Sequence, residues 1–546
     1  MEVVAHTLRR RAGWGVWLDG PSWVPAVALS AALTGALLAW DPRVPDLAAH
    51  TFRSELFAQN GFAIFNGSWY GGHYVLTQSA LFPPLAALIG ARLVAAAAVV
   101  WSVYLFDRLA RTRWGDGAGM ATLWYGAGAV TMLASGRLSF ALGVALALAS
   151  LRALQVGRPW LGATGALGSA LASPVAAVFL AGIIVVASLV ERPRSLRSAL
   201  GVSAAALLPV AVLNTVFAEQ SQEPFSFSAW VALPLWCAAA LYLSRGLTRE
   251  RALRAVVAGY LLVGTLVWLV PNPLGGNVTR LGALFGGPVL AAVVPPRRLP
   301  LQRAILALAI AGSLWWQLQP AVRDVAEGTS DQAAHASYYR PLADWLHSHG
   351  GQRSRLEVPF TSGHWESAYL APDFQLARGW LRQEDRARNV LFYRGKLTHA
   401  GYREWLRENA VRYVALPDAG IDYSARAERR LIVDGPSYLR LRAQLPHWRV
   451  YEVVRARPLV EPVGPAAGRL REIGPDSFVL TVRRPGTFVV RIRETPFWSL
   501  KSGVGCVGDG GPWTVVRADR PGTVKVSIAF SPRRAWRAAT GGHRRC

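Results

Sequence analysis

The sequence predicts a polytopic α-helical membrane protein with about eleven transmembrane helices, followed by a C-terminal extracytoplasmic region that combines an α/β domain with a β-sandwich. Three observations lead to this fold class. Of the 546 residues, 52% are hydrophobic, and many gather in runs long enough to cross a bilayer. Arginines concentrate in alternate segments between these runs. After residue 318 the apolar runs stop, and a composition typical of soluble domains begins.

Membrane helices need about 17 to 20 predominantly apolar residues, and the first domain, residues 1–318, offers eleven such runs. The stretch 160–190 could form one long helix or two short ones. We expect a break before Pro174, because a single span would reverse the arginine bias of every later segment. The first run should remain as an anchor, since it is too long for a secretory signal and lacks a small-residue cleavage site. The expected spans are residues 22–40, 85–106, 117–134, 138–155, 160–173, 175–190, 198–217, 227–244, 252–270, 279–295 and 301–318.

The distribution of arginine predicts the orientation of these spans. With the N-terminus inside, the cytoplasmic segments hold eighteen arginines, whereas the outward segments hold five. Positive charge is retained on the cytoplasmic side of membranes. We therefore expect a multi-pass protein of the cytoplasmic membrane whose C-terminal region lies outside.

The net charge of +26 does not indicate a nucleic-acid partner. Only three of the 59 basic residues are lysines, and the arginines are not gathered in the sequence into one tail or one patch. Their place between apolar runs accounts for most of the excess, so the expected partner is the lipid bilayer.

The C-terminal region divides by its patterning. In residues 319–457, HASYYRPLADWLHSH predicts an amphipathic helix, and a second helix, Tyr402 to Asn409, leads into the apolar strand VRYVAL. In residues 458–531, segments such as SFVLTV and TFVVRIR alternate with period two between glycine-containing turns, which predicts a small β-sandwich. Residues 532–546 are expected to form a disordered basic tail.

Cysteine is scarce, with three residues in the chain. Cys237 falls in an expected span and is read as packing. Cys506 and Cys546 both lie in the outside region and could pair, although the sequence leaves this open.

Polar residues follow the first span directly. If the chain is helical from Pro45, Asp46 and His50 stand at i and i+4, so a carboxylate and an imidazole share one face just outside the bilayer. They are the candidate catalytic pair. Asp46 could instead simply cap a helix over 47–60 that Gly61 closes. Asp41 reads as a turn residue, yet Asp41 and Asp46 together could hold a divalent cation, the one cofactor the sequence leaves open.

The same loop contains Trp69-Tyr70-Gly71-Gly72-His73-Tyr74. Aromatic rings here could form an interfacial belt at headgroup depth. Adjacent glycines before His73 favour a loop wrapped closely around a polar ligand, because glycine permits close backbone approach and positive φ. We take Trp69 and Tyr70 as candidate sugar-binding residues and His73 as a candidate phosphate ligand.

Two arginines, Arg137 and Arg280, stand at outward ends of expected spans. Arginine near hydrocarbon is costly unless it pairs or faces water, and its guanidinium fork suits a phosphate group. Both are candidate phosphate ligands, with Asn277 of the same GNVTR segment. Snorkelling to the headgroups is the alternative.

A further polar set lies in TSGHWESAYLAP and LARGWLRQ of the outside region. Aromatic faces beside charged groups are typical of a carbohydrate surface, and equally of a domain that packs onto a membrane portion. The candidate sugar or acceptor residues are His364, Trp365, Glu366, Arg378 and Trp380.

This layout resembles the GT-C superfamily of membrane glycosyltransferases, whose members have a catalytic acidic residue in the first external loop and often a C-terminal extracytoplasmic domain. Asp46-x-x-x-His50, followed by a tryptophan-glycine loop and a proline-rich return, is similar to membrane proteins named for a relation to 6-pyruvoyl-tetrahydropterin synthase, which belong to that superfamily. SGRLSFALG, GNVTR, HWESAYLAP, ARGWLRQ and VRYVALPD are similar to uncharacterised actinobacterial multipass proteins, some labelled as transporters. The chain lacks the paired Asp-Asp or Asp-Glu that some members show in this loop.

The resemblance implies a glycosyltransferase that uses a polyprenyl-phosphate-linked sugar at the outer membrane face, with a cell-envelope glycan, lipid or protein as acceptor. Asp46 would orient or deprotonate the acceptor hydroxyl, while Arg137 and Arg280 would neutralise the lipid phosphate. Two alternatives stay open at this stage. One is a transporter or a lipid or glycolipid flippase, and the other is a non-catalytic cell-envelope scaffold.

Overall fold

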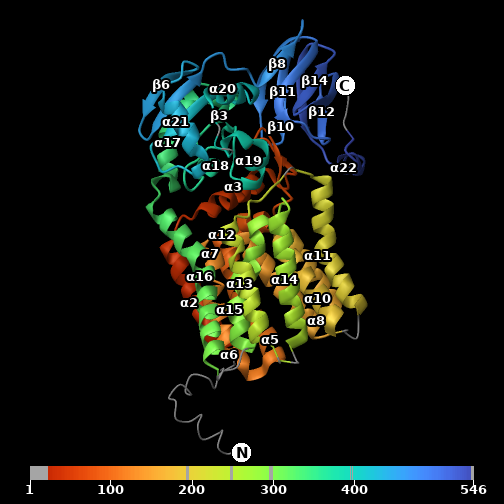
Figure 1. The fold of residues 1–546 in the computed structure, drawn as a ribbon. Helices are drawn as coiled ribbons and strands as arrows, with labels where there is room; N and C mark the ends of the chain where they lie inside the picture. Colours follow the sequence, from red (N-terminus) through yellow and green to blue (C-terminus); the bar gives the residue numbers. More distant parts are fainter. Residues whose placement is uncertain are drawn as a thin grey trace, which may run out of the picture. The chain divides into compact units, whose positions relative to one another are not determined.

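The computed structural model describes residues 23–191, 196–219, 221–245, 247, 250–293, 299–393, 395, 397–542 and 546 (Figure 1). The chain divides into two compact units. The predicted N-terminal arginines, residue 22 of the first expected span and residues 294–295 of the tenth lie outside the described residues. Unit 1 takes the described residues that fall within Met1–Pro42, Ile89–Pro209 and Pro224–Val325, and unit 2 takes those within Arg43–Leu88, Val210–Glu223 and Ala326–Cys546.

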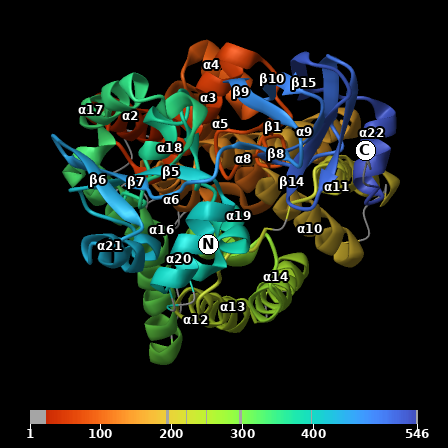
Figure 2. The ribbon, with the colours of Figure 1, turned by 90° about the horizontal axis from the view of Figure 1, so that it is seen from above.

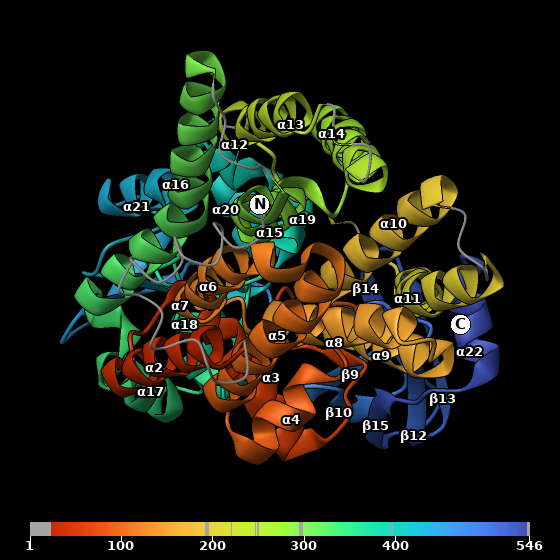
Figure 3. The same ribbon diagram turned by 90° about the horizontal axis from the view of Figure 1, so that it is seen from below.

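Unit 1 is formed by packed helices with small side chains at their contacts. The helices that lie wholly or partly in unit 1 are α2 (Val24–Trp40), α5 (Ala91–Trp114), α6 (Ala118–Gly128), α7 (Thr131–Ala134), α8 (Leu138–Gln155), α9 (Pro159–Ala172), α10 (Pro174–Glu191), α11 (Leu196–Val216), α12 (Phe227–Trp230), α13 (Ala232–Leu243), α14 (Arg251–Leu269), α15 (Thr279–Val293) and α16 (Pro300–Ser330). Helix α8 packs along α5 and α9 (Figure 3). At Gly126 of α6, a Cβ would lie 2.7 Å from the Ala26 carbonyl oxygen of α2, so only glycine permits this approach.

Six helical stretches among the described residues are long and apolar enough to cross a membrane, or seven if α2 and α3 (Pro45–Asn60) together form one span. A helix covers each expected position, and Ser173 and Pro174 separate α9 from α10 as predicted. The expected span 85–106 is interrupted at Gly90, which has a φ of +94°, and α5 begins only at Ala91. The apolar helices are those of a membrane protein, while the number of eleven spans and their orientation remain predictions.

The α/β part of unit 2 is built on a five-stranded sheet with the order β4-β3-β5-β7-β6. Its strands are β3 (Arg355–Glu357), β4 (Gln375–Leu376), β5 (Val411–Pro417), β6 (Leu439–Leu445) and β7 (Trp448–Val453). Strand β3 is parallel to β4 and β5. Strand β7 lies between β5 and β6 and is antiparallel to both (Figure 2). The helices are α17 (Ala336–Ser348), α18 (Glu366–Tyr369), α19 (Arg382–Arg388), α20 (His399–Glu408) and α21 (Arg426–Val433).

Two sequence predictions for this part are confirmed. Tyr338, Leu342 and Leu346 of α17 are buried, as the amphipathic pattern requires. The VRYVAL segment is strand β5, and the helix before it, α20, begins slightly earlier than predicted because the Thr398 side chain accepts a hydrogen bond from the Gly401 amide and caps it.

The β-sandwich has two four-stranded antiparallel sheets, ordered β12-β15-β10-β9 and β13-β14-β11-β8. Its strands are β8 (Val460–Val463), β9 (Ala467–Ile473), β10 (Ser477–Arg484), β11 (Gly486–Arg493), β12 (Trp498–Ser502), β13 (Gly505–Gly510), β14 (Trp513–Ala518) and β15 (Gly522–Ile528). The alternating residues Phe478, Leu480 and Val482 are buried in its core, opposite Phe488 and Val490. The predicted sandwich is therefore confirmed.

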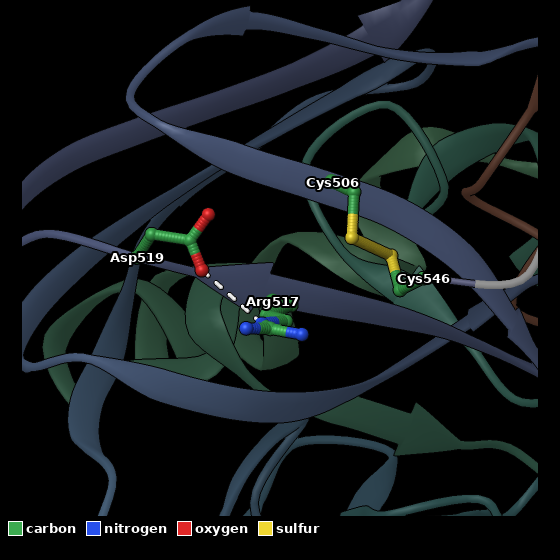
Figure 4. Close-up of a disulfide and its surroundings, with 4 residues drawn as sticks. All are labelled: Cys506, Arg517, Asp519 and Cys546. Carbon is green, nitrogen blue, oxygen red and sulfur yellow. Dashed lines mark hydrogen bonds and ion pairs between the residues drawn. A yellow bond between two sulfur atoms is a disulfide. The ribbon is translucent and has the colours of Figure 1, made fainter.

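The expected disordered tail is wrong for most of its length. Residues Pro532–Ala539 form helix α22, because Ser531 caps it and the Arg534 guanidinium donates to Ala529 O at 2.8 Å. Cys546 forms a disulfide with Cys506 of β13, with 5.6 Å between their Cα atoms (Figure 4). The pairing that the sequence left open is present.

Candidate functional site

The first loop of unit 2 contains α3, the short antiparallel strands β1 (Phe65–Asn66) and β2 (His73–Tyr74), and α4 (Phe82–Ile89). Asp46 and His50 both lie in α3, one turn apart, as predicted. Asp46 is half-buried in the first turn, where its charge is favourable at a helix N-terminus. It does not cap the helix, because α3 already begins at Pro45, a residue preorganised for the first helical position. Gly61 ends α3, as predicted.

The start of α3 is held by residues from the C-terminal region within unit 2. The Trp380 indole donates to the Pro45 carbonyl at 3.2 Å. The Arg43 guanidinium donates to the Tyr369 hydroxyl at 3.4 Å and lies 5.9 Å from the centre of the Trp365 ring. The structure therefore brings the two candidate sets, Asp46 in the first loop and the tryptophans of the C-terminal region, to one place.

The tryptophan-glycine loop is buried in the same unit. Trp69 is fully buried, stacked on Phe52 at 4.3 Å and on His73 at 5.3 Å between ring centres. Its indole donates to the Ser367 carbonyl at 3.1 Å, and the Tyr70 hydroxyl lies 2.6 Å from the Gly379 carbonyl oxygen. Because both rings are enclosed by protein, an exposed interfacial belt at these positions is wrong.

The glycines of this loop are required by the protein's own packing. Gly72 has a φ of +138°, and a Cβ there would lie 2.1 Å from the Phe65 ring. The Gly71 carbonyl accepts from the Arg493 amide of β11 at 2.7 Å, and the Gly72 carbonyl accepts from the Arg388 guanidinium at 2.9 Å. The loop thus links the α/β part to the β-sandwich. A role around a ligand stays a prediction.

Both histidines of the first loop are buried. Burial lowers the pKa of His73 to about 3, and the charges of Arg388 and Arg53 act in the same direction. His73 is therefore neutral at physiological pH, and its contact with a phosphate stays a prediction. The His50 ring lies 5.0 Å from that of Phe82.

His364 and Glu366 sit in a polar cluster with Arg382 and Asp422. The Arg382 guanidinium donates two hydrogen bonds to the Asp422 carboxylate, at 2.9 and 2.8 Å, and its Nη2 lies 3.1 Å from His364 Nε2. His364 has a φ of +55°, a strained backbone for a residue with a side chain. Burial raises the pKa of Glu366 to about 8, although Thr361 donates to it at 2.6 Å.

Several buried polar atoms in this cluster have no hydrogen-bond partner among the described residues. Such atoms are rare in folded proteins and call for a ligand, an ordered water or a functional reason. They are His364 Nδ1, Trp365 Nε1, Glu366 Oε1 and Asp331 Oδ2. The sequence singled out the first three of these residues, but not Asp331 or Asp422.

Arg378 is occupied by internal contacts. Its guanidinium forms two hydrogen bonds with Asp385, at 3.1 and 2.6 Å, and lies between the rings of Phe360 and Phe392 at 3.9 and 4.0 Å. Glu428 approaches it at 3.4 Å. These contacts account for Arg378 as part of the core, and its predicted sugar contact remains untested.

Arg137 and Arg280 both lie in unit 1, on segments that meet at Phe140. Arg137 is the N-terminal flanking residue of α8, and Phe140 lies in the first turn of that helix. The Arg280 guanidinium lies over the Phe140 ring at 5.3 Å. Asn277 belongs to the short 3-10 helix Gly275–Val278, directly before Arg280 and α15. The three predicted phosphate ligands therefore come from two adjoining chain segments of one unit.

Asp41 and Asp46, the predicted metal ligands, are not joined by further His, Cys, Asp or Glu ligands among the described residues. Asp41 ends α2 in unit 1 and is ion-paired with Arg92, whereas Asp46 belongs to unit 2. Among the described residues, no group of three or more His, Cys, Asp or Glu side chains could hold a metal ion. The divalent cation stays a prediction.

A second polar site in unit 2 was missed by sequence reasoning. The Tyr74 amide donates to Glu219 Oε1 at 2.5 Å, and Arg388 bridges Glu219 and Glu384 at 3.3 and 3.1 Å. Burial raises the pKa of Glu219 well above its ordinary value. A cavity of about 380 Å³ opens beside these residues and also exposes Arg493. Nothing in the isolated segment around Glu219 forms a recognisable motif.

Comparison with known proteins gives a limited result. No protein-family model matches the chain, and no curated protein matches it. Among solved structures, the chain is similar to the cryo-EM structure of the arabinofuranosyltransferase AftD from mycobacteria, with 16% sequence identity and a TM-score of 0.47. The similar region covers 94% of this chain but 57% of the other, so the chain spans little more than half of that protein.

Proposed function

We propose that the protein is a membrane glycosyltransferase of the GT-C type, which transfers a sugar from a polyprenyl-phosphate donor to a cell-envelope glycan, lipid or protein at the outer membrane face. The observation that carries this proposal is the fixed position of Asp46. Its helix begins against Trp380, through the Pro45 carbonyl, and beside Arg43, which contacts Tyr369. The first turn of α3, which bears this half-buried carboxylate, is thereby held by side chains of the C-terminal region.

In the proposed reaction, Asp46 accepts the proton of the acceptor hydroxyl as that oxygen attacks the anomeric carbon of the donor sugar. The bond from that carbon to the phosphate oxygen breaks, and the polyprenyl phosphate leaves with its charge. General-base catalysis of this kind contributes typically 10²–10⁴-fold to a rate. An oxocarbenium-like transition state is expected by analogy with glycoside hydrolysis.

The donor phosphate is assigned to Arg137 and Arg280. Arg280 contacts Phe140 in the first turn of α8, the helix that Arg137 precedes, and this supports a shared anion site. Guanidinium groups bind phosphate through paired hydrogen bonds and stabilise the negative charge that grows on the leaving group. His50 and His73 would add hydrogen bonds, and Asn277 an amide. No contact among the described residues favours transport or a purely structural role over transfer.

The test is a transfer assay with purified full-length protein, a labelled polyprenyl-phosphate sugar and candidate envelope acceptors. Asp46→Asn should lower the transfer rate by at least about 100-fold, because the amide cannot accept the proton. Glu55→Gln is the matched control, since Glu55 is an exposed carboxylate on the same helix, and it should leave transfer unchanged. Transfer that survives Asp46→Asn at the wild-type rate would refute the assignment.

A further inference from the structure

A cavity of about 610 Å³ lies in unit 2, where the α/β sheet meets the β-sandwich. It is formed around the linker Val454–Leu459, which connects β7 to β8, and is completed by the end of β7, β6, β9 and the turn before β3. None of the candidate residues discussed above lines it. The cavity is therefore a separate site.

Six arginines surround this cavity, and among the described residues one carboxylate lines it. Arg412 approaches that carboxylate, Glu452, at 3.7 Å, and Glu452 is shared with Arg442 outside the cavity. The other five arginines make no ion pair or side-chain hydrogen bond within the described part of the chain. Uncompensated positive charge in a concave site attracts anions. The six arginines are Arg353, Arg412, Arg440, Arg455, Arg457 and Arg469.

The backbone of the linker adds an independent observation. Arg455 has a φ of +57°, in the left-handed region that residues with side chains seldom adopt. Strain of this kind concentrates at ligand sites, where the surrounding structure holds a side chain in a required position. Arg455 adopts such a conformation in the lining of the cavity.

We propose that this cavity binds an anionic glycan, a saccharide chain that carries phosphate or carboxylate groups. Arginine forks recognise both groups through paired hydrogen bonds. The volume lies in the range of known ligand pockets, about 300–1,000 Å³. Val453, Leu459 and Leu470 contribute apolar surface to the lining, which suits the C–H faces of sugar rings.

Two other anionic ligands fit the cavity less well. Its concave shape, between a sheet and a sandwich, does not match the planar surface of a bilayer. None of its described lining residues is aromatic, so it has no platform on which nucleic-acid bases could stack. The proposal does not depend on glycosyl transfer, and loss of the Asp46 assignment would leave it standing.

The test is a binding titration with full-length protein in detergent at low salt. The probes are a saccharide polymer joined through phosphodiesters, an oligogalacturonate, neutral dextran, polyglutamate and vesicles of phosphatidylglycerol. We expect the protein to bind the phosphodiester-linked probe or the oligogalacturonate. Binding of the former would identify phosphate as the recognised group, and binding of the latter would identify carboxylate. Binding should weaken as salt rises. Neutral dextran, polyglutamate or vesicles binding as tightly as both glycan probes would overturn the proposal.

A matched pair of variants locates the site. Arg455→Asn/Arg469→Gln removes two cavity charges, and asparagine tolerates the positive φ of residue 455. Binding of the glycan probe should weaken by about tenfold or more. Arg471→Gln/Arg517→Gln removes two exposed charges of the same sandwich that pair with Glu472 and Asp519, and it should bind within about twofold of wild type. Figure 4 shows the pair of Arg517 with Asp519. Equal binding by the cavity variant, with an unchanged unfolding temperature of the sandwich, would overturn the proposal.

Discussion

Trp69→Ala should release the first loop from the C-terminal region of unit 2. The indole is fully buried, stacks on Phe52 and His73, and donates to the Ser367 carbonyl. Replacing a buried tryptophan by alanine costs about 3–5 kcal/mol, since a cavity remains and the packed surface is lost. At about 1.4 kcal/mol per factor of ten, the local opening equilibrium should rise roughly 150-fold to 5,000-fold.

Hydrogen exchange of the full-length protein measures this opening. The loop amides of Gly72 and Val75 donate to Trp69 O at 2.7 Å and Ile64 O at 3.2 Å, and the Leu376 amide donates to Ser68 O at 2.8 Å. Peptides covering these amides should lose protection by the factor above, because all three hydrogen bonds depend on the docked loop.

Trp448→Ala is the matched control for this experiment. Trp448 is equally enclosed, and its indole donates to the Tyr338 carbonyl at 2.9 Å, so its loss should expose α17 and β7 instead of the loop. Exchange at residues 64–76 that changes by less than about threefold in Trp69→Ala would refute the reasoning, because opening would then not depend on the indole.

Two further predictions concern stability. Burial and the neighbouring Glu428 carboxylate raise the pKa of Glu357 well above its ordinary value of 4.5, so the folded protein keeps a proton that the unfolded chain releases. The free energy of unfolding should therefore fall as pH rises above that value, by about 1.4 kcal/mol per pH unit for one proton. Thermal unfolding of Glu357→Gln should show a weaker dependence on pH. A variant whose stability depends on pH as strongly as that of wild type would contradict this prediction. Cys546→Ser should cost the sandwich about 4 kcal/mol by the loop-closure relation, because it opens a disulfide that spans 40 residues. If a reductant left the stability of the wild-type sandwich unchanged, that result would contradict this value.

Local sequence signals were sufficient for the elements with a single strong cause. Proline has no backbone N–H and disfavours a helical conformation in the residue before it. The break between α9 and α10 at Pro174 was therefore predictable. The burial of Leu342 and Leu346 in α17 follows from helical spacing, and that of Leu480 in β10 from period two. The position of Asp46 and His50 one turn apart on α3 was likewise predictable from local helical spacing.

Contacts between distant segments could not be predicted in this way. Trp69 and Ser367 are separated by 298 residues, and no local pattern records that the indole of one meets the carbonyl of the other. The same limit explains why Gly71 and Gly72 suggested a ligand loop, although their close neighbours are Arg355 and Phe65 of the protein itself.

Charge patterns were similarly incomplete. The arginines are dispersed in the sequence, yet six of them surround one cavity. Two, Arg455 and Arg457, lie in the linker Val454–Leu459 itself, and the other four come from the turn before β3 and from β5, β6 and β9. The C-terminal segment was expected to be disordered on composition alone. Ser531, the contacts of Arg534 and the Cys506–Cys546 disulfide order it instead.

The most direct test of the central claim is a cryo-EM density map of the full chain with a bound polyprenyl-phosphate sugar. The account predicts that the phosphate contacts Arg137 and Arg280 and that the anomeric carbon of the sugar lies beside the Asp46 carboxylate. A phosphate bound away from both arginines, or a sugar that does not reach Asp46, would contradict it.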